Sequence, residues 1–113
     1  TSVLIERENA PPSAPSTPAG KDIAFTGEHV EYVVFATDPN GDPVSITMDW
    51  GDETAPTRSP SVPSGSNVTI GHTFSRAGIF DIRAFATDSK GLIGTFSNAK
   101  SVAISLRFVE CEE

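Results

Sequence analysis

Residues 44–50 read Val-Ser-Ile-Thr-Met-Asp-Trp, and apolar and polar side chains alternate along the whole stretch. Successive side chains of a β-strand point to opposite faces of the sheet, so this alternation predicts a strand. One face of that strand is apolar, with Val44, Ile46, Met48 and Trp50. The stretch therefore predicts a strand with one face against a hydrophobic core.

Similar patterns recur on both sides of this strand, between the nine Gly and nine Pro residues of the chain. No stretch keeps apolar residues at the i, i+3, i+4, i+7 spacing of an amphipathic helix, so we expect no helix. Alternating or β-branched runs predict further strands at residues 29–37, 67–74, 79–87 and 100–109. With about seven short strands separated by turns, the fold class expected is all-β, an immunoglobulin-like sandwich of two sheets.

Two segments rich in Pro and Ser interrupt this pattern. Residues 10–20 favour extended conformations, and we expect a linker that passes into an irregular first strand. Residues 51–65 are expected to form a long loop. The aromatic side chains between these segments are the expected large core residues: Phe25, Phe35, Trp50, Phe74, Phe80 and Phe85.

Length and charge limit the possible functions. The 113 residues suffice for one domain, and the formal net charge is -7, from 15 acidic against 8 basic residues. Lys and Arg do not cluster, so we expect no nucleic-acid partner. No apolar run reaches the ~20 residues of a membrane span, so we expect a domain that is not itself embedded in a membrane. We also expect the isolated domain to be monomeric. Because Thr1 opens the chain without a signal-peptide pattern, we expect a piece of a longer protein.

The single cysteine, Cys111, excludes an internal disulfide, so the core must be held by packing.

Two short sequence patterns are repeated within the chain. Phe-Ala-Thr-Asp at 35–38 is followed by Gly41, and the same four residues at 85–88 are followed by Gly91. Residues 2–5 also resemble residues 101–104, which suggests the end of a preceding module and a tandem array.

Residues 48–53, Met-Asp-Trp-Gly-Asp-Glu, resemble the Trp-Asp-Phe-Gly-Asp-Gly signature of the PKD (polycystic kidney disease) domain. The resemblance extends from about Asn9 to Ile104. Its other motifs are the turn at 38–43 and the stretches 72–74, 78–82 and 86–91.

Three residues depart from the signature. Met48 stands where the family usually has Trp, and Trp50 stands where it has Phe. Both positions are expected to face inward, so the exchange can preserve core volume. Glu53 replaces a Gly, and we expect a less tight turn there.

The resemblance implies an extracellular module of a larger cell-surface or secreted protein, with no catalytic site of its own. Such modules occur in surface-layer and adhesion proteins, in polycystins, and in secreted proteases, chitinases and collagenases. We divide the chain into a tail or linker (1–8), the PKD-like sandwich (9–109) and a C-terminal tail (110–113). The expected function is a spacer or adhesion module whose partners are adjacent modules, other surface proteins or polysaccharide.

An alternative is a carbohydrate-binding or substrate-presenting accessory module of a secreted hydrolase. Sugar binding needs an exposed Trp or Tyr platform. The chain has one of each, Trp50 and Tyr32. Because Trp50 is expected in the core, only Tyr32 is free for that role.

We expect no enzyme activity. A catalytic triad needs a nucleophile, a base and an orienting acid in contact, and no Gly-x-Ser-x-Gly motif is present. His72 is expected to bond the loop that carries Asp49 and Asp52. Of these acids, Asp49 should face outward, and Asp52 should accept amide hydrogen bonds within its turn.

A Ca²⁺ site is the candidate functional site. In an immunoglobulin-like sandwich the second and sixth strands run the same way, so the loops that follow them emerge at one pole. The chain also enters at that pole, so the topology predicts that oxygen ligands from three segments converge there. The expected ligands are Asn9, Asp38, Asp42 and Asp88. Some PKD-like modules of secreted bacterial collagenases resemble this arrangement. The competing interpretation is that Asp38 and Asp88 only cap their own turns.

Overall fold

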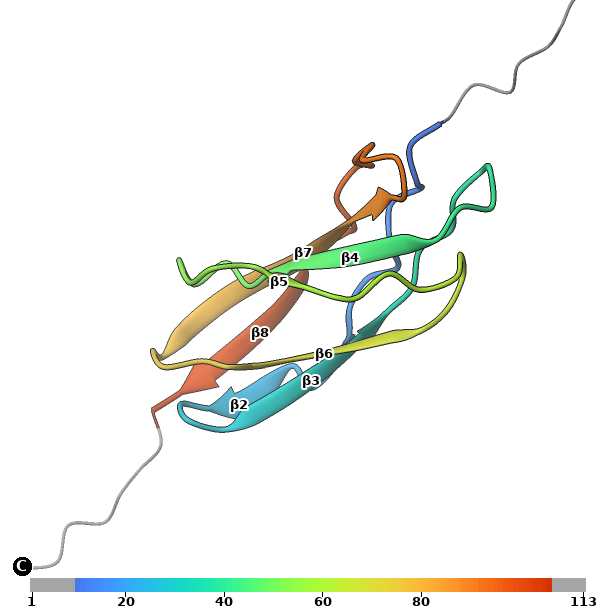
Figure 1. Ribbon diagram of the computed structural model, residues 1–113. Coiled ribbons are helices and arrows are strands. Elements are labelled where there is room, and N and C mark those ends of the chain that lie inside the picture. Colours follow the sequence, from blue (N-terminus) through green and yellow to red (C-terminus); the bar gives the residue numbers. More distant parts are fainter. Residues whose placement is uncertain (1–9, 107–113) are drawn as a thin grey trace, which may run out of the picture.

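The computed structural model describes residues 10–106 and consists of two packed β-sheets (Figure 1). The three-stranded sheet has the order β1 (Ala19–Gly20), β3 (His29–Val34) and β6 (Val68–Thr73). The five-stranded sheet has the order β2 (Ile23–Phe25), β8 (Lys100–Ser105), β7 (Gly78–Asp88), β4 (Val44–Asp49) and β5 (Thr57–Arg58). The predicted all-β sandwich is confirmed.

Every strand pair is antiparallel except β2 with β8, which is parallel. The described residues contain no helix with the length and hydropathy of a membrane-spanning segment. The described chain begins at one pole of the sandwich and ends at the other (Figure 1).

The core lies between the sheets and is filled by alternate side chains of the long strands. Its fully buried members include Tyr32, Val34, Ile46, Met48, Trp50, Ile82 and Val102. Met48 and Trp50 are both buried, so the expectation that the exchanged residues face inward is confirmed. The indole of Trp50 stacks on His72 and meets Phe74 edge to face, and its Nε1 donates a hydrogen bond to Thr57 Oγ1 at 3.0 Å.

Three of the expected core aromatics lie elsewhere. Phe25 is 47% exposed and Phe35 is 45% exposed, because the strand alternation turns their neighbours Ala24 and Val34 inward. Phe85 is half-buried on the outer face of the five-stranded sheet, where its ring meets Phe96 edge to face. The core is therefore more aliphatic than the aromatic pattern predicts.

The expectation that Tyr32 is free was wrong. Its side chain is fully buried and its hydroxyl donates a hydrogen bond to the backbone oxygen of Lys21 at 2.7 Å. Gly20 makes room for the ring, since a Cβ there would lie 2.5 Å from the Tyr32 ring. Neither Trp50 nor Tyr32 offers a platform for a sugar.

The loop expected at residues 51–65 contains the short edge strand β5. The indole bond to Thr57 fixes its start, and Val62 pairs with Val44 further along. Both contacts are made with β4 or the residue that follows it, so the local Pro/Ser composition of the loop did not indicate them.

The turn after β4 ties the two sheets together. His72 Nε2 lies 2.8 Å from Asp52 Oδ2, and Thr54 donates its amide to Asp52 Oδ1, as the sequence predicted. Glu53 adopts the left-handed conformation (φ 70°), which is usual for glycine. The turn therefore keeps the backbone geometry of a glycine at this position, whereas we expected a less tight turn. Gly51 lies so close to Asp81 that a Cβ would stand 2.5 Å from its carbonyl oxygen.

The carboxyl of Asp52 is buried, which by itself raises its pKa. The hydrogen bonds from Thr54 and His72 outweigh that burial, and the net effect lowers the pKa of Asp52 below its ordinary value of 3.8. The native state therefore binds fewer protons here than the unfolded chain between those two pKa values. Asp52 stabilises the fold above pH ~4, and that contribution is lost as the pH falls through the native pKa.

Replacing Asp52 with Asn tests the contribution of the Asp52 carboxylate and its hydrogen bonds to stability. At pH 7 we expect Asp52→Asn to lower the free energy of unfolding by ~1–3 kcal/mol, because a buried charge-assisted hydrogen bond is lost. The difference from wild type should shrink as the pH is lowered from about 5 to 2, as measured by urea unfolding. The exposed Asp22→Asn serves as the control. A wild-type advantage that stays constant over this range would contradict the assignment.

Candidate metal site

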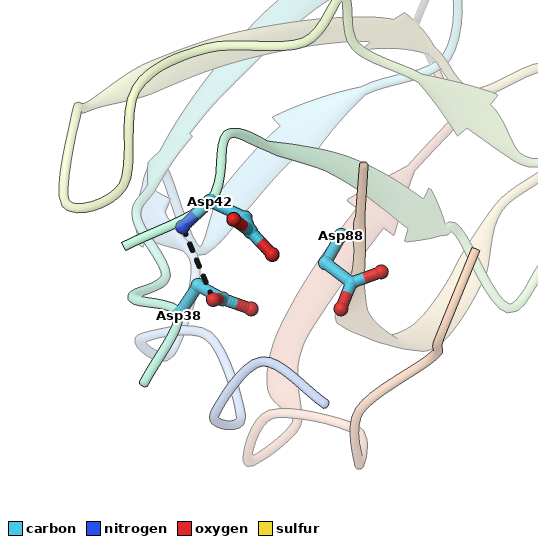
Figure 2. Close-up of side chains that lie close together, drawn as sticks. All are labelled: Asp38, Asp42 and Asp88. Atoms are coloured by element: carbon cyan, nitrogen blue, oxygen red, sulfur yellow. Dashed lines mark hydrogen bonds between the residues drawn. The ribbon is translucent and has the colours of Figure 1, made fainter. Parts of the chain in front are cut away.

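Two loops at the N-terminal pole bring three carboxylates together. Asp38 and Asp42 lie in the loop between β3 and β4, and Asp88 is the last residue of β7. Val44, the first residue of β4, is the register partner of Asp88, so strand pairing sets the first loop beside the second. One oxygen from each carboxylate lies within 4.8 Å of the others (Figure 2).

Each arm of this cluster has the same local geometry. Asp38 Oδ2 accepts hydrogen bonds from the amides of Asn40 and Asp42, at 2.8 and 3.1 Å. Asp88 Oδ1 accepts hydrogen bonds from the amides of Lys90 and Leu92, both at 2.9 Å. The turn-capping role of both aspartates is therefore confirmed, and it explains the repeated Asp-x-x-Gly spacing.

Capping leaves one carboxylate oxygen of Asp38 unexplained. Asp38 is only 6% exposed, and its Oδ1 is buried with no hydrogen-bond partner among the described residues. Figure 2 shows the oxygen that does not take the drawn hydrogen bond pointing toward Asp88. Burying an unpaired carboxylate oxygen is unfavourable, and a positive ligand at this atom would offset that cost.

The three carboxylates also concentrate negative charge in a small volume. Asp88 is 4% exposed and Asp42 is half-buried, so three like charges lie close together with little solvent. Lys90 provides partial compensation, with its Nζ 3.4 Å from Asp42 Oδ2. An all-oxygen donor set suits a hard cation such as Ca²⁺, which takes six to eight oxygen ligands.

The N-terminal segment runs along both loops. The amide of Ala10 donates a hydrogen bond to Asn40 Oδ1 at 2.8 Å, and the amide of Ser13 donates to the Thr37 carbonyl at 2.9 Å. On the other side, Gly94 lies against Pro12, where a Cβ would stand 2.2 Å from the Pro12 oxygen. The three expected segments do meet at this pole (Figure 1). Asn9, the fourth expected ligand, lies outside the described residues.

The two histidines of the chain lie away from this cluster. His72 is stacked on Trp50 at the opposite end of β4, and His29 is exposed beside Glu31. Between residues 10 and 106 no pocket opens. The motif at residues 48–53 therefore serves the core and the turn beside it.

Comparison with known proteins places the chain among modular β-sandwiches. The family model of the PKD domain matches residues 9–100. The solved PKD domain of an M14-like peptidase from Thermoplasmatales archaeon SCGC AB-540-F20 is 27% identical with a TM-score of 0.78, over 87% of this chain and 99% of that chain.

A more distant structure is the CARDB domain of a Pyrococcus furiosus protein, solved in complex with di-metal ions. It is 13% identical with a TM-score of 0.55, over 86% of this chain and 93% of that chain, and at this identity it shows similarity of fold alone. A search among curated proteins finds no match.

Two substitutions of Asp38 separate its capping role from its charge. In chelator, Asp38→Ala should lower the free energy of unfolding by ~1–2 kcal/mol, because both amide hydrogen bonds are lost. Asp38→Asn retains an accepting oxygen and removes one of three like charges, so it should be at least as stable as wild type without a cation. Equal destabilisation by both substitutions, measured by thermal and urea unfolding, would contradict a charge-strained cluster.

Proposed function

Because this chain belongs to the PKD domain family, we propose that it is a non-catalytic module of a larger cell-surface or secreted protein. In that protein it acts as a spacer or as an adhesion module. The observation that favours a spacer is the path of the chain, since the described residues enter at one pole and leave at the other (Figure 1). Modules with this geometry can be joined end to end, with adjacent modules as their nearest partners.

We further propose that the N-terminal pole binds Ca²⁺ through Asp38, Asp42 and Asp88, with Asn9 as an additional ligand. The buried, unpaired Oδ1 of Asp38 is the single observation that carries this proposal. Backbone carbonyls and water would complete the coordination. Because Asn40 holds the Ala10 amide from the same loop, a bound cation would also stiffen the junction with the preceding segment.

The second candidate function is an accessory module of a secreted hydrolase. It is favoured by the similarity to the PKD domain of an M14-like peptidase. Sugar binding by a Trp or Tyr platform is disfavoured, because Trp50 and Tyr32 are buried. The gene sequence around this module separates the two: further Asp-x-x-Gly and Trp-Gly-Asp motifs support an array, whereas a catalytic domain supports the hydrolase.

Calorimetric titration of chelator-treated protein tests the cation site. We expect Ca²⁺ to bind with a dissociation constant of ~10⁻⁴–10⁻³ M, the range of extracellular modules. Ca²⁺ at a hundred times that constant should stabilise the fold by ~2.7 kcal/mol. Asp38→Asn and Asp88→Asn should abolish the binding, and the exposed Asp22→Asn should preserve it.

A domain that releases no heat and shows no thermal shift up to ~10 mM Ca²⁺, well above that range, would refute the cation site. Binding that survives both Asp38→Asn and Asp88→Asn would show that the ion binds elsewhere.

A further inference from the structure

Lys90 connects the two arms of the acidic cluster. Its amide donates a hydrogen bond to Asp88 Oδ1, so its backbone belongs to the second loop. Its Nζ lies 3.4 Å from Asp42 Oδ2, which belongs to the first loop. The Lys90 side chain is 61% exposed and that of Asp42 is 18% exposed, so the ammonium approaches the cluster from solvent.

Lys90 occupies the same position in the second copy of the repeated motif as Asn40 does in the first. In the first arm, Asp38-Pro-Asn-Gly41, the third residue is Asn40, and its side chain holds the N-terminal segment through Ala10. In the second arm, Asp88-Ser-Lys-Gly91, the third residue is Lys90, and its side chain reaches across to the first arm. The third residue of the turn therefore carries a side-chain amide in the first arm and a cationic side chain in the second.

The charges decide what that cation does. The cluster holds three carboxylates, and in the described part of the chain Lys90 is the basic residue in ion-pair contact with it. An ammonium at this distance neutralises part of the carboxylate charge without entering the buried site beside Asp38 Oδ1. A divalent ion that takes Asp42 as a ligand would be repelled by Lys90 and would displace it.

We propose that Lys90 is a tethered counter-ion that binds Asp42 in the cation-free domain and competes with Ca²⁺ for that carboxylate. This inference rests on the proposed Ca²⁺ site and concerns its regulation. Lys90 weakens Ca²⁺ binding and steadies the two loops when no ion is bound. It also makes Ca²⁺ affinity depend on ionic strength, since an exposed ion pair is screened by salt.

Lys90→Gln removes the charge and keeps the approximate length of the side chain. Titration calorimetry at low ionic strength should show Ca²⁺ binding about three- to tenfold tighter than wild type. The gain should shrink as NaCl is raised from about 20 to 500 mM. In chelator, the variant should unfold at a lower temperature than wild type.

The matched control is Lys21→Gln, which also removes one lysine from an ion pair, here with Glu28. It should leave the Ca²⁺ affinity unchanged. If both proteins bind Ca²⁺ and Lys90→Gln binds it no more tightly than wild type, the proposed role of Lys90 is wrong and the calcium site stands. Absence of binding by both proteins would overturn the calcium site and this inference with it.

Discussion

The indole of Trp50 is the contact on which the two sheets depend. It follows β4 in the five-stranded sheet, and its ring stacks on His72 of β6 in the other sheet, with centroids 4.3 Å apart and planes 8° apart. Asp52, two residues further on, bonds the same imidazole. A large buried ring and a buried hydrogen-bonded pair therefore act at one place, and the domain needs no disulfide to join its layers.

The contact of Trp50 and Asp52 with His72 also helps to position the loops at the opposite pole. β4 is paired with β7 along its whole length, from Asp49 with Arg83 at the Trp50 end to Val44 with Asp88 at the other. A rigid ladder of this kind holds the loop after β3 beside the end of β7. The three carboxylates therefore lie close together because the strands place them there, and their mutual repulsion is opposed by the fold.

Much of this arrangement could be predicted from the sequence. Alternation fixed the inner face of β4, and the twin Asp-x-x-Gly motifs with the strand directions placed Asp38, Asp42 and Asp88 at one pole. The errors concern residues whose type suggested another position. Phe35 and Phe25 are aromatic but occupy outward positions, and Tyr32 is amphipathic but its ring is buried and its hydroxyl binds a backbone oxygen. The unpaired oxygen of Asp38 and the contact of Lys90 depend on side-chain placement between distant loops, which local sequence does not contain.

The most direct measurement is a Ca²⁺ titration followed by amide NMR. The amides of Asn40, Asp42, Lys90 and Leu92 donate to the carboxylates of the site and report on it residue by residue. We expect these four amides to shift most and to saturate together, with Ala10 following through Asn40. Shifts that are absent, or that centre on acidic residues elsewhere such as the Asp52 turn, would contradict a cation site at this pole.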